Sequence, residues 1–432
     1  MNLASWGNYP SVNNNALSCE TVEQLRDIIC RYRDMIPYGN GRSYGDSALS
    51  ANIIDTRKLC NMLSFNEDTG VLHCQAGVFL SDIVSVFLPR GWFLSVTPGT
   101  KLITVGGAIA SDVHGKNHHI EGCFSSCVKE FTLMVGTGEM LTCSASENAE
   151  LFRATCGGMG LTGVITDAKI VLKKVRSAYI DQVTVKTKNL QETFDAFEQN
   201  HAMPYSVAWI DCLAMGKRAG RCVLMAGDFR QDGQLDYKPP TGMNVPVMFP
   251  SFVLNKAAVK TFNWLYYAKS LNREKPARVD ADAFFYPLDA VKNWNRMYGK
   301  GGFTQYQCIF PKNKSYEGLE RILHAIAESG KGSFLAVLKL YGKANENYLS
   351  FPMEGYSLAL DFKIEPGVFS LLDSLDRIVL EYSGRIYLTK DVRVTRDVFE
   401  QGYPYIDRFR KVRKEYGLED KFSSLQSKRV GI

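Results

Sequence analysis

The chain has 432 residues, of which 45% are hydrophobic and 22% are charged, and its formal net charge is +6. This length predicts two domains, because a single core rarely grows beyond about 250–300 residues. The mild positive charge is compatible with an anionic ligand or an acidic membrane surface and demonstrates neither, and we expect no nucleic-acid partner. The eleven cysteines are odd in number and stand apart, which excludes a disulfide scaffold and favours a reducing compartment.

Targeting and membrane-spanning patterns are absent from the sequence. The start, MNLASWGNYPSVNNN, lacks the basic and apolar regions of a signal peptide. No run of about 18 apolar residues occurs. We therefore expect a cytoplasmic protein and leave open a peripheral contact with the inner face of the membrane.

The first part of the chain mixes helices and strands. Thr21–Asp34 has apolar residues at helical spacing, and Thr21 with Gln24 has the spacing of a capping box. The pattern then predicts, in order, a strand over Val71–Gln75, a helix over Leu80–Leu88, a hairpin of Glu130–Val135 and Glu139–Cys143, a short helix over Ser146–Thr155 and a strand over Val164–Leu172.

One motif in this part is misleading. Gly158, Gly160 and Gly163 have the G-x-G-x-x-G spacing of dinucleotide-binding folds. That motif must follow a strand and lead into a helix. Here it follows a predicted helix and leads into a predicted strand, so we reject a Rossmann fold.

Beyond Lys174–Ala178 the glycine density falls and the pattern changes. Strands are predicted over Ile180–Lys186, Tyr205–Ile210, Arg221–Ala226 and Arg385–Leu388, and helices over Asn189–Gln199, Leu319–Ala327, Val368–Leu380 and 406–416. This order is typical of an α+β domain with an antiparallel sheet.

Tyr237–Asn272, within this second part, is predicted to be irregular. It contains four prolines and the apolar run Val245–Leu254. Long irregular segments are uncommon unless they are functional or disordered. Two interpretations stay open: a packed surface loop, or a mobile lid that faces lipid.

Two glycine-rich stretches carry the strongest functional signal. Tyr38–Asp46 reads YGNGRSYGD, and Thr97–His119 reads TPGTKLITVGGAIASDVHGKNHH. Glycines and small residues let a backbone approach a ligand and expose N–H groups, which suit a diphosphate. Two such stretches indicate a long ligand with a diphosphate at its middle.

These stretches, with LSDI, RGWFLSVTPGT and CGGMGLTGVIT, resemble the flavin-binding half of the vanillyl-alcohol-oxidase type of FAD enzymes. SYGD, DVHGKNHH, FFYPLDAVKNWNRMYG, QYQ and YLTKDVR are similar to one branch, the decaprenylphosphoryl-ribose 2′-oxidase family. The resemblance covers nearly the whole chain. It implies an α+β fold with a PCMH-type FAD-binding domain over 1–176, a substrate-binding domain with an antiparallel sheet over 177–384, and a return to the first domain over 385–432.

The resemblance also implies the cofactor, FAD, and the residues that contact it. The expected FAD contacts are Tyr38, Gly39, Asn40, Gly41, Arg42, Ser43, Tyr44, Gly45, Pro98, Gly99, Thr100, Thr104, Gly106, Gly107, Ala110, Ser111, His114, Gly115, Asn117, His118, Gly158, Gly160, Gly163, Val164 and Ile165.

Tyr44 stands where several members of the wider family carry a histidine that is bonded to the flavin. A phenol does not ordinarily make that bond, so we expect non-covalent FAD. His114 and His118 are four residues apart, but Gly115 and Asn117 disfavour a helix and no Glu follows His114. We therefore expect no metal site.

The resemblance implies catalytic roles for Lys390, His114 and Tyr44. A fixed ammonium at Lys390 would stabilise charge that develops during hydride transfer, or hold the hydroxyl whose proton leaves. The expected substrate contacts are Lys116, Trp209, Gln305, Gln307, Ser357 and Lys390.

Two positions of the substrate pocket need comment. Gln305 and Gln307 are two apart, so both amides can face one side of a strand and bond sugar hydroxyls. Relatives that are inhibited by covalent capture carry a cysteine where this chain has Ala359, and an asparagine near it is Ser357 here. The pocket therefore departs from the family pattern.

The implied function is FAD-dependent oxidation of a secondary sugar hydroxyl to a ketone, at the 2′ position of a polyprenylphosphoryl pentose. An NAD(P)H-dependent short-chain reductase would then complete an epimerisation for cell-envelope glycan synthesis. Two alternatives stay open: an oxidase of small alditols or aldonolactones, and a flavin-binding partner subunit without turnover. The apolar run Val245–Leu254 favours a lipid substrate.

Tyr44 predicts that FAD leaves the protein on denaturation. After acid precipitation and centrifugation, the yellow colour should be in the supernatant. Yellow colour that stays in the washed pellet would show a covalent bond and contradict this expectation.

Overall fold

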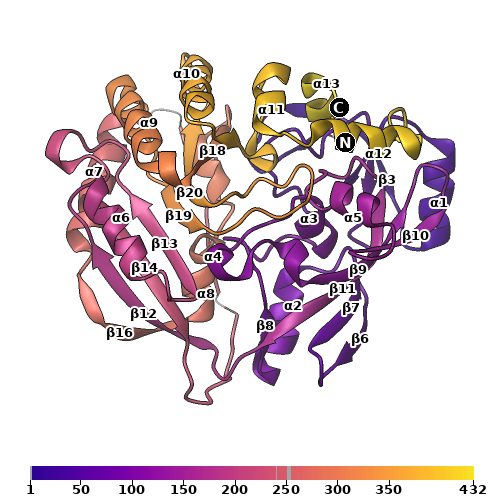
Figure 1. Ribbon diagram of the computed structural model, residues 1–432, viewed down its shortest axis with the longest axis horizontal. Coiled ribbons are helices and arrows are strands. Elements are labelled where there is room, and N and C mark those ends of the chain that lie inside the picture. The colour runs from indigo at the N-terminus through magenta and orange to yellow at the C-terminus, as the bar shows by residue number, and fades with distance from the viewer. Residues whose placement is uncertain (1, 240, 251–253) are drawn as a thin grey trace.

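The computed structural model describes residues 2–239, 241–250 and 254–432. Two large antiparallel sheets lie side by side, each with helices packed on it (Figure 1). This is the α+β architecture that the sequence predicts. The first sheet has the order β10-β9-β11-β7-β6, with β8 added to β11. Its strands are β6 (Met62–Asn66), β7 (Val71–Gln75), β8 (Trp92–Leu94), β9 (Val128–Met134), β10 (Met140–Ser144) and β11 (Val164–Lys174).

The second sheet has eight strands in the order β16-β12-β14-β13-β19-β20-β18-β21. These are β12 (Tyr179–Lys186), β13 (Tyr205–Ile210), β14 (Cys222–Phe229), β16 (Arg273–Asp280), β18 (Phe303–Pro311), β19 (Ala336–Tyr341), β20 (Gly355–Lys363) and β21 (Arg385–Ile386). Small sheets pair β3 (Asn15–Ser18) and β4 (Met35–Tyr38) with β5 (Asn52–Asp55), β1 (Asn2–Ala4) with β2 (Ser11–Asn13), and β15 (Met243–Asn244) with β17 (Val291–Lys292).

The helices begin with α1, whose start is the one that the sequence indicates. The Thr21 side chain accepts a hydrogen bond from Gln24 N at 3.2 Å, and Gln24 Oε1 accepts one from Glu20 N at 2.8 Å. The helices are α1 (Val22–Arg31), α2 (Leu80–Phe87), α3 (Val105–Ala110), α4 (His118–Glu121), α5 (Ala149–Thr155), α6 (Leu190–Gln199), α7 (Lys256–Lys269), α8 (Ala281–Phe285), α9 (Ser315–Ser329), α10 (Val368–Glu381), α11 (Arg396–Gly402), α12 (Ile406–Glu415) and α13 (Leu425–Val430).

Every strand and helix that the periodicity predicts is present, within a few residues at each end. The strand expected over Arg385–Leu388 is shorter, because a 3₁₀ turn, η7 (Leu388–Lys390), replaces its second half. Gly158–Gly163 forms a turn between α5 and β11, which confirms that the glycine spacing is not a Rossmann motif.

The prediction that Tyr237–Asn272 is irregular throughout is wrong, because α7 occupies fourteen of its residues. Asn255 begins the helix, with its side-chain oxygen accepting a hydrogen bond from Ala258 N at 3.0 Å. Apolar residues lie on two sides of α7, so no single apolar stripe marks it in the sequence. Residues 240 and 251–253 lie outside the described part, and the lid interpretation stays a prediction.

The two large sheets are joined by polar contacts of Thr97–Lys101 with α8 and the turn after it. Lys101 Nζ lies 2.6 Å from both carboxylate oxygens of Asp282, and both side chains are buried. Thr100 donates to Asp289 at 2.7 Å. The second glycine stretch is therefore held against a segment of the other half of the chain.

Asp112 makes a second junction. Its buried carboxylate accepts hydrogen bonds from Asn345 at 2.7 Å, Asn347 at 3.0 Å and Ser350 at 2.7 Å, all in the β19–β20 connection. The connection that projects from the large sheet is thereby tied to the residues that follow α3.

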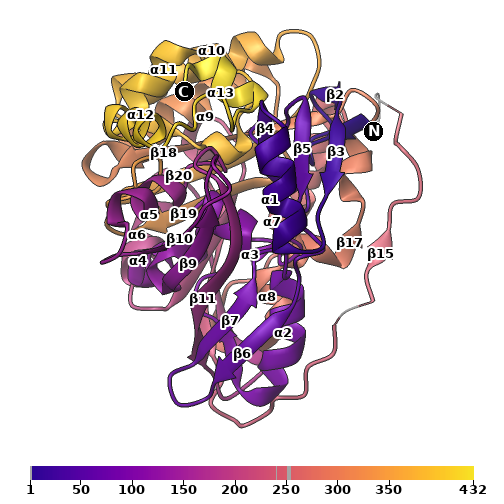
Figure 2. The ribbon, with the colours of Figure 1, turned by 90° about the vertical axis from the view of Figure 1, so that its right-hand side faces the viewer.

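The C-terminal part contacts both halves of the molecule. β21 pairs with β18 at the edge of the eight-stranded sheet, and Phe422 forms a bridge with Met35 of β4. Figure 1 shows α11–α13 in yellow at the top, and Figure 2 shows α13 beside β4. The limits 1–176, 177–384 and 385–432 stay predictions.

Two further expectations bear on compartment. All eleven cysteines are free thiols, of which Cys30 and Cys60 are exposed and the others buried. In the described ranges, no helix is both long and apolar enough to cross a bilayer.

Candidate active site

A cavity of about 520 Å³ lies where the two halves of the chain meet. One wall is made by the loop after β4, the segment 98–114 with α3, and the turn that leads into β11. The opposite wall is made by β13, β18, β19, β20 and η7. The two glycine stretches thus form one wall, and the strand that carries both glutamines belongs to the other.

The glycine wall depends on close backbone contact. A Cβ on Gly39 would lie 2.5 Å from Thr104 Oγ1, and Asn40 donates to Leu102 O at 2.8 Å. Gly41 has φ +58°, a conformation that glycine adopts at little cost. The two glycine stretches are far apart in the sequence, and in the fold they pack against each other and form one surface with few side chains.

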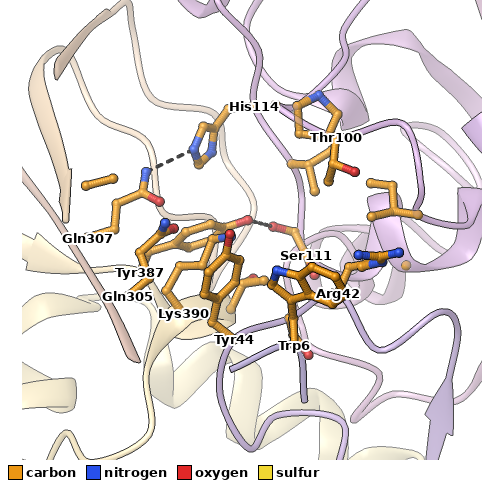
Figure 3. Close-up of a pocket in the computed structure, with 18 of the residues that line it drawn as sticks. Trp6, Arg42, Tyr44, Thr100, Ser111, His114, Gln305, Gln307, Tyr387 and Lys390 are labelled. Atoms are coloured by element: carbon orange, nitrogen blue, oxygen red, sulfur yellow. Dashed lines mark hydrogen bonds between the residues drawn. The ribbon is translucent and has the colours of Figure 1, made fainter. Parts of the chain in front are cut away.

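Tyr44 and Lys390 meet at the junction of the two walls (Figure 3). Lys390 Nζ lies 3.8 Å from the centre of the Tyr44 ring, which is a cation–π distance. Burial raises the pKa of Tyr44 well above 10, so the phenol stays neutral. On the glycine side, the Arg42 guanidinium stacks on Trp6 at 3.8 Å.

His114 is buried and neutral. Burial, with nearby Lys339, lowers its pKa well below 6.5. Gln307 Nε2 lies 3.2 Å from His114 Nε2, and an amide N–H₂ only donates, so the ring proton belongs on Nδ1. That buried Nδ1 has no hydrogen-bond partner among the described residues.

Three lysines reach the cavity: Lys116, Lys339 and Lys390. Burial lowers the pKa of Lys116 to about 7, that of Lys390 to about 7 and that of Lys339 to about 8. The charge of Lys339 contributes to the shift of the other two. Amines held this way favour an anionic ligand, because its charge restores the stability of the ammonium form.

Asp361 is the buried acid behind this wall. Gln305 Nε2 donates to its Oδ1 at 2.5 Å, and Tyr298 OH lies 3.5 Å from Oδ2. Burial raises the pKa of Asp361 to about 7, and the charge of Lys390 opposes part of that rise. The carboxyl therefore orients Gln305 and shares its electrostatic environment with Lys390.

Most of the residues expected at the site line the cavity. They are Tyr38, Gly39, Asn40, Gly41, Arg42, Ser43, Tyr44, Pro98, Gly99, Thr100, Thr104, Gly106, Gly107, Ala110, Ser111, His114, Gly160, Gly163, Val164 and Ile165 on the cofactor side, with Lys116, Trp209, Gln305, Gln307, Ser357 and Lys390 on the substrate side. Ala359 lines it as well, two residues from Ser357 on β20.

Five expected cofactor contacts lie behind the wall instead: Gly45, Gly115, Asn117, His118 and Gly158. Asn117 donates to Ser95 O at 2.7 Å, and the His118 ring lies between Gly342 N and Cys123 Sγ. Neighbouring protein backbone explains why these three positions need glycine. A Cβ would meet Asp391 O at Gly45, Thr97 O at Gly115 and Ala154 O at Gly158. Their contacts are structural, so we do not assign them to the cofactor.

Several cavity residues were not singled out from the sequence. They include Trp6, Asp289, Trp294, Lys339, Tyr341 and Tyr387. Tyr387 donates from its hydroxyl to Ser111 O at 2.9 Å and joins the two walls. For Lys339 a signal exists: β19 alternates, with Leu338 and Leu340 facing the core and Val337 and Lys339 facing the cavity.

Comparison with known proteins agrees with this geometry. Residues 15–144 match the family of FAD binding domains. Along its whole length the chain is 34% identical to decaprenylphosphoryl-β-D-ribose oxidase of Mycolicibacterium smegmatis, of which it covers 97%. The chain belongs to this oxidase family. It is an FAD-dependent oxidoreductase that acts on CH–OH groups, with the vanillyl-alcohol-oxidase type of fold.

Other relatives are more distant. The chain is 28% identical to an uncharacterised protein in the mprA 5′ region of Streptomyces coelicolor, over 82% of this chain and all of that protein. It is 28% identical to D-arabinono-1,4-lactone oxidase of Yarrowia lipolytica, but over 35% of this chain and 30% of that protein. Family membership sets aside the interpretation as a flavin-binding partner without turnover.

The cavity residues fit FAD. The glycine wall presents backbone N–H groups, the Arg42 cation lies beside it, and the buried Nδ1 of His114 has an unused donor. A diphosphate needs such donors and a positive charge. Among the described residues, no group of His, Cys, Asp and Glu is arranged to hold a metal ion.

Lys339 predicts a pH-dependent stability effect. The folded pKa of about 8 lies below the ordinary 10.5, so the unfolded state binds more protons between these values and stability rises with pH there. Lys339→Met removes a buried ammonium and should raise the melting temperature at pH 7. This gain should shrink as the pH approaches 10.

The control is Lys129→Met, a change of an exposed lysine on β9, which should change neither the melting temperature at pH 7 nor its dependence on pH. Melting curves of the FAD-loaded proteins across the pH range test the expectation. A Lys339→Met variant that melts below wild type at pH 7 would contradict it.

Proposed function

We propose that the protein oxidises the 2′-hydroxyl of a polyprenylphosphoryl pentose to a ketone. The observation that carries this proposal is the set of three lysines that line the substrate half of the cavity together with Gln305 and Gln307. The name of the full-length relative, which specifies a decaprenylphosphoryl ribose, supports the same substrate class.

Each part of the substrate half suits one part of such a molecule. The ammonium groups of Lys116 and Lys339 attract a phosphate, and the amides of Gln305 and Gln307 bond sugar hydroxyls. The remaining wall is apolar, with Trp209, Phe334, Val337 and other aliphatic and aromatic residues. It suits the first units of a prenyl chain.

We assign the proton of the reacting hydroxyl to Nζ of Lys390. FAD, when bound, supplies the acceptor for the hydride that leaves the carbinol carbon. The hydroxyl proton must leave as well, so that the alcohol becomes a ketone. A pKa of about 7 leaves part of Lys390 as neutral amine at neutral pH, and such an amine accepts a proton.

Two neighbours support this role. The Tyr44 ring contacts the end of the Lys390 side chain, with Nζ 3.8 Å from the centre of the ring. Asp361 lies close enough for its charge to raise the pKa of Lys390 against the effect of burial. His114, which is neutral, contributes a hydrogen-bond donor rather than a charge.

The ketone product is the substrate for a reduction that returns the opposite configuration. We propose that a separate NAD(P)H-dependent short-chain reductase performs it, so that the pair epimerises the sugar for cell-envelope glycan synthesis. Chemically, an oxidase alone leaves a keto sugar, and inversion of a carbinol centre requires this second step.

Anaerobic reduction of the bound flavin tests the substrate. A panel of prenylphosphoryl pentoses, the free pentoses, alditols and aldonolactones should give fast bleaching with the prenylphosphoryl sugars alone. Comparable bleaching by free alditols or lactones, with none by the prenylphosphoryl sugars, would replace the proposal with the small-polyol alternative.

Lys390 should be required for flavin reduction. Loss of a group that stabilises the transition state typically costs ~3–4 kcal/mol, which is on the order of 10²–10³ in rate. Lys390→Ala should therefore keep FAD and reduce it at least ~100-fold more slowly in stopped flow. Lys390→Arg should not rescue fully, because a guanidinium does not accept a proton near neutral pH.

Lys411→Ala serves as the control, because the Lys411 side chain is 75% exposed on α12, where ion pairs contribute only ~0–1 kcal/mol. Its rate should equal that of wild type. A near wild-type rate of reduction in Lys390→Ala would remove this residue from the mechanism.

A further inference from the structure

The outward face of α7 is apolar although it is exposed. Phe262 is 42% exposed, Trp264 58% and Leu265 45%, and Leu271 just beyond the helix is 61% exposed. Single exposed apolar residues are common on protein surfaces, whereas contiguous groups of large ones mark a binding surface. This group therefore calls for a partner.

Most of the exposed uncharged residues of α7 lie along one side of the helix. Ala257, Thr261, Trp264, Leu265 and Ala268 follow the helical repeat and are all exposed, and none of them is charged. The opposite face is anchored: Asn263 donates to Asp211 at 2.9 Å, and Tyr267 donates to Thr187 O at 2.9 Å. A helix that is apolar on both sides normally has a partner on both.

The charged residues on α7 and in the chain around it, from Tyr237 to Arg273, are all basic. From Tyr237 to Arg273 the sequence contains no Asp or Glu. Lys256, Lys260 and Lys269 are exposed on α7. Basic residues beside exposed Trp and Leu are typical of helices that lie in the interface of an anionic bilayer.

The same helix borders the cavity. Phe262 and Tyr266 line it, and Phe262 is also exposed, so the cavity opens beside α7. The Tyr266 ring lies 4.7 Å from that of Trp209, and the Phe262 ring lies 5.6 Å from that of Phe334. A row of aromatic rings thus leads from the cavity to the exposed face.

We propose that α7 docks the protein on an anionic lipid bilayer, with Trp264 and Leu265 among the headgroups and the cavity mouth at Phe262 facing the lipid. A prenyl chain would then remain partly in the bilayer while its sugar reaches Lys390. This last step rests on the proposed function, whereas the docking surface itself rests on exposure and charge.

Vesicle binding tests the surface without any substrate. The FAD-loaded protein should co-sediment with phosphatidylglycerol–phosphatidylcholine vesicles and much less with phosphatidylcholine alone. Trp264 fluorescence should shift to the blue and be quenched by brominated lipid, because the other four tryptophans are buried or half-buried. Trp264→Phe should keep binding and lose this signal.

Substitutions on α7 should weaken binding in proportion to their charge and polarity. A Trp264→Glu, Leu265→Glu double variant should bind at least ~10-fold less. Replacing Lys256, Lys260 and Lys269 with Gln should reduce binding on the order of 100-fold, since each basic group near the surface contributes about 1 kcal/mol. Leu63→Glu on β6, where Leu63 is 50% exposed, is the matched control and should bind as wild type.

Retained FAD absorbance in each variant shows that the fold is intact, because none of the substituted residues lines the cavity. Wild-type protein that ignores anionic vesicles, or a double Glu variant that binds them equally, would overturn the proposal. So would a dimer that is lost in the double variant while vesicles are not bound, because the face would then join two copies of the chain.

These results are separate from the test of substrate. Vesicle binding without flavin reduction by prenylphosphoryl sugars would retain the docking surface and reject the proposed function. Flavin reduction by detergent-dispersed substrate without vesicle binding would retain the function and reject the surface.

Discussion

The active site depends on one close approach of backbone to backbone. Tyr44 N donates to Thr389 O at 3.0 Å, and the missing side chain of Gly45 leaves room for the carbonyl of Asp391. Arg429 pairs with both Asp46 and Asp391 at 2.8 and 3.0 Å, so one cation also links the two segments. Because the first glycine loop and the C-terminal return touch here, Lys390 reaches the ring of Tyr44. Any side chain at position 45 would separate them.

The buried lysines of the cavity destabilise the free protein, and this destabilisation can serve ligand binding. Lys116, Lys339 and Lys390 all have lowered pKa values because burial disfavours their charged forms. A buried acid, Asp361, balances only part of this charge. A buried ammonium attracts an anion more strongly than an exposed one, because less water screens the interaction. The uncompensated buried charge destabilises the free protein, and a phosphorylated ligand that binds it therefore stabilises the folded state.

The two faces of α7 link this chemistry to the surface of the molecule. One face supplies Phe262 and Tyr266 to the cavity, and the other presents Trp264 and Leu265 outward. A long apolar substrate tail does not fit beside a cofactor in a cavity of about 520 Å³ and must leave it somewhere. The aromatic end of the cavity, beside a basic helix, is where the structure provides an apolar route.

The sequence by itself determined the elements and the chemistry of the cofactor wall. Period-2 and period-3.6 patterns depend on neighbours along the chain, so α1, β7, β11 and β13 were predictable. The order of helix and strand around Gly158–Gly163 was enough to reject a Rossmann fold. The two glycine stretches were recognisable because backbone exposure needs small residues wherever the chain goes, whereas the role of Tyr44 was implied by the family resemblance.

Only the tertiary structure decided which residues face the cavity. Gly45, Gly115 and Gly158 looked like cofactor contacts, but a glycine is equally small whether a ligand or another backbone approaches it. Lys339 looked like any lysine in a strand until the fold placed its face of β19 on the cavity, near enough to Lys390 for its charge to lower the pKa of Lys390. α7 has two apolar faces, so its pattern had no single direction. In each case the deciding neighbour lies far along the chain, and local spacing carries no information about it.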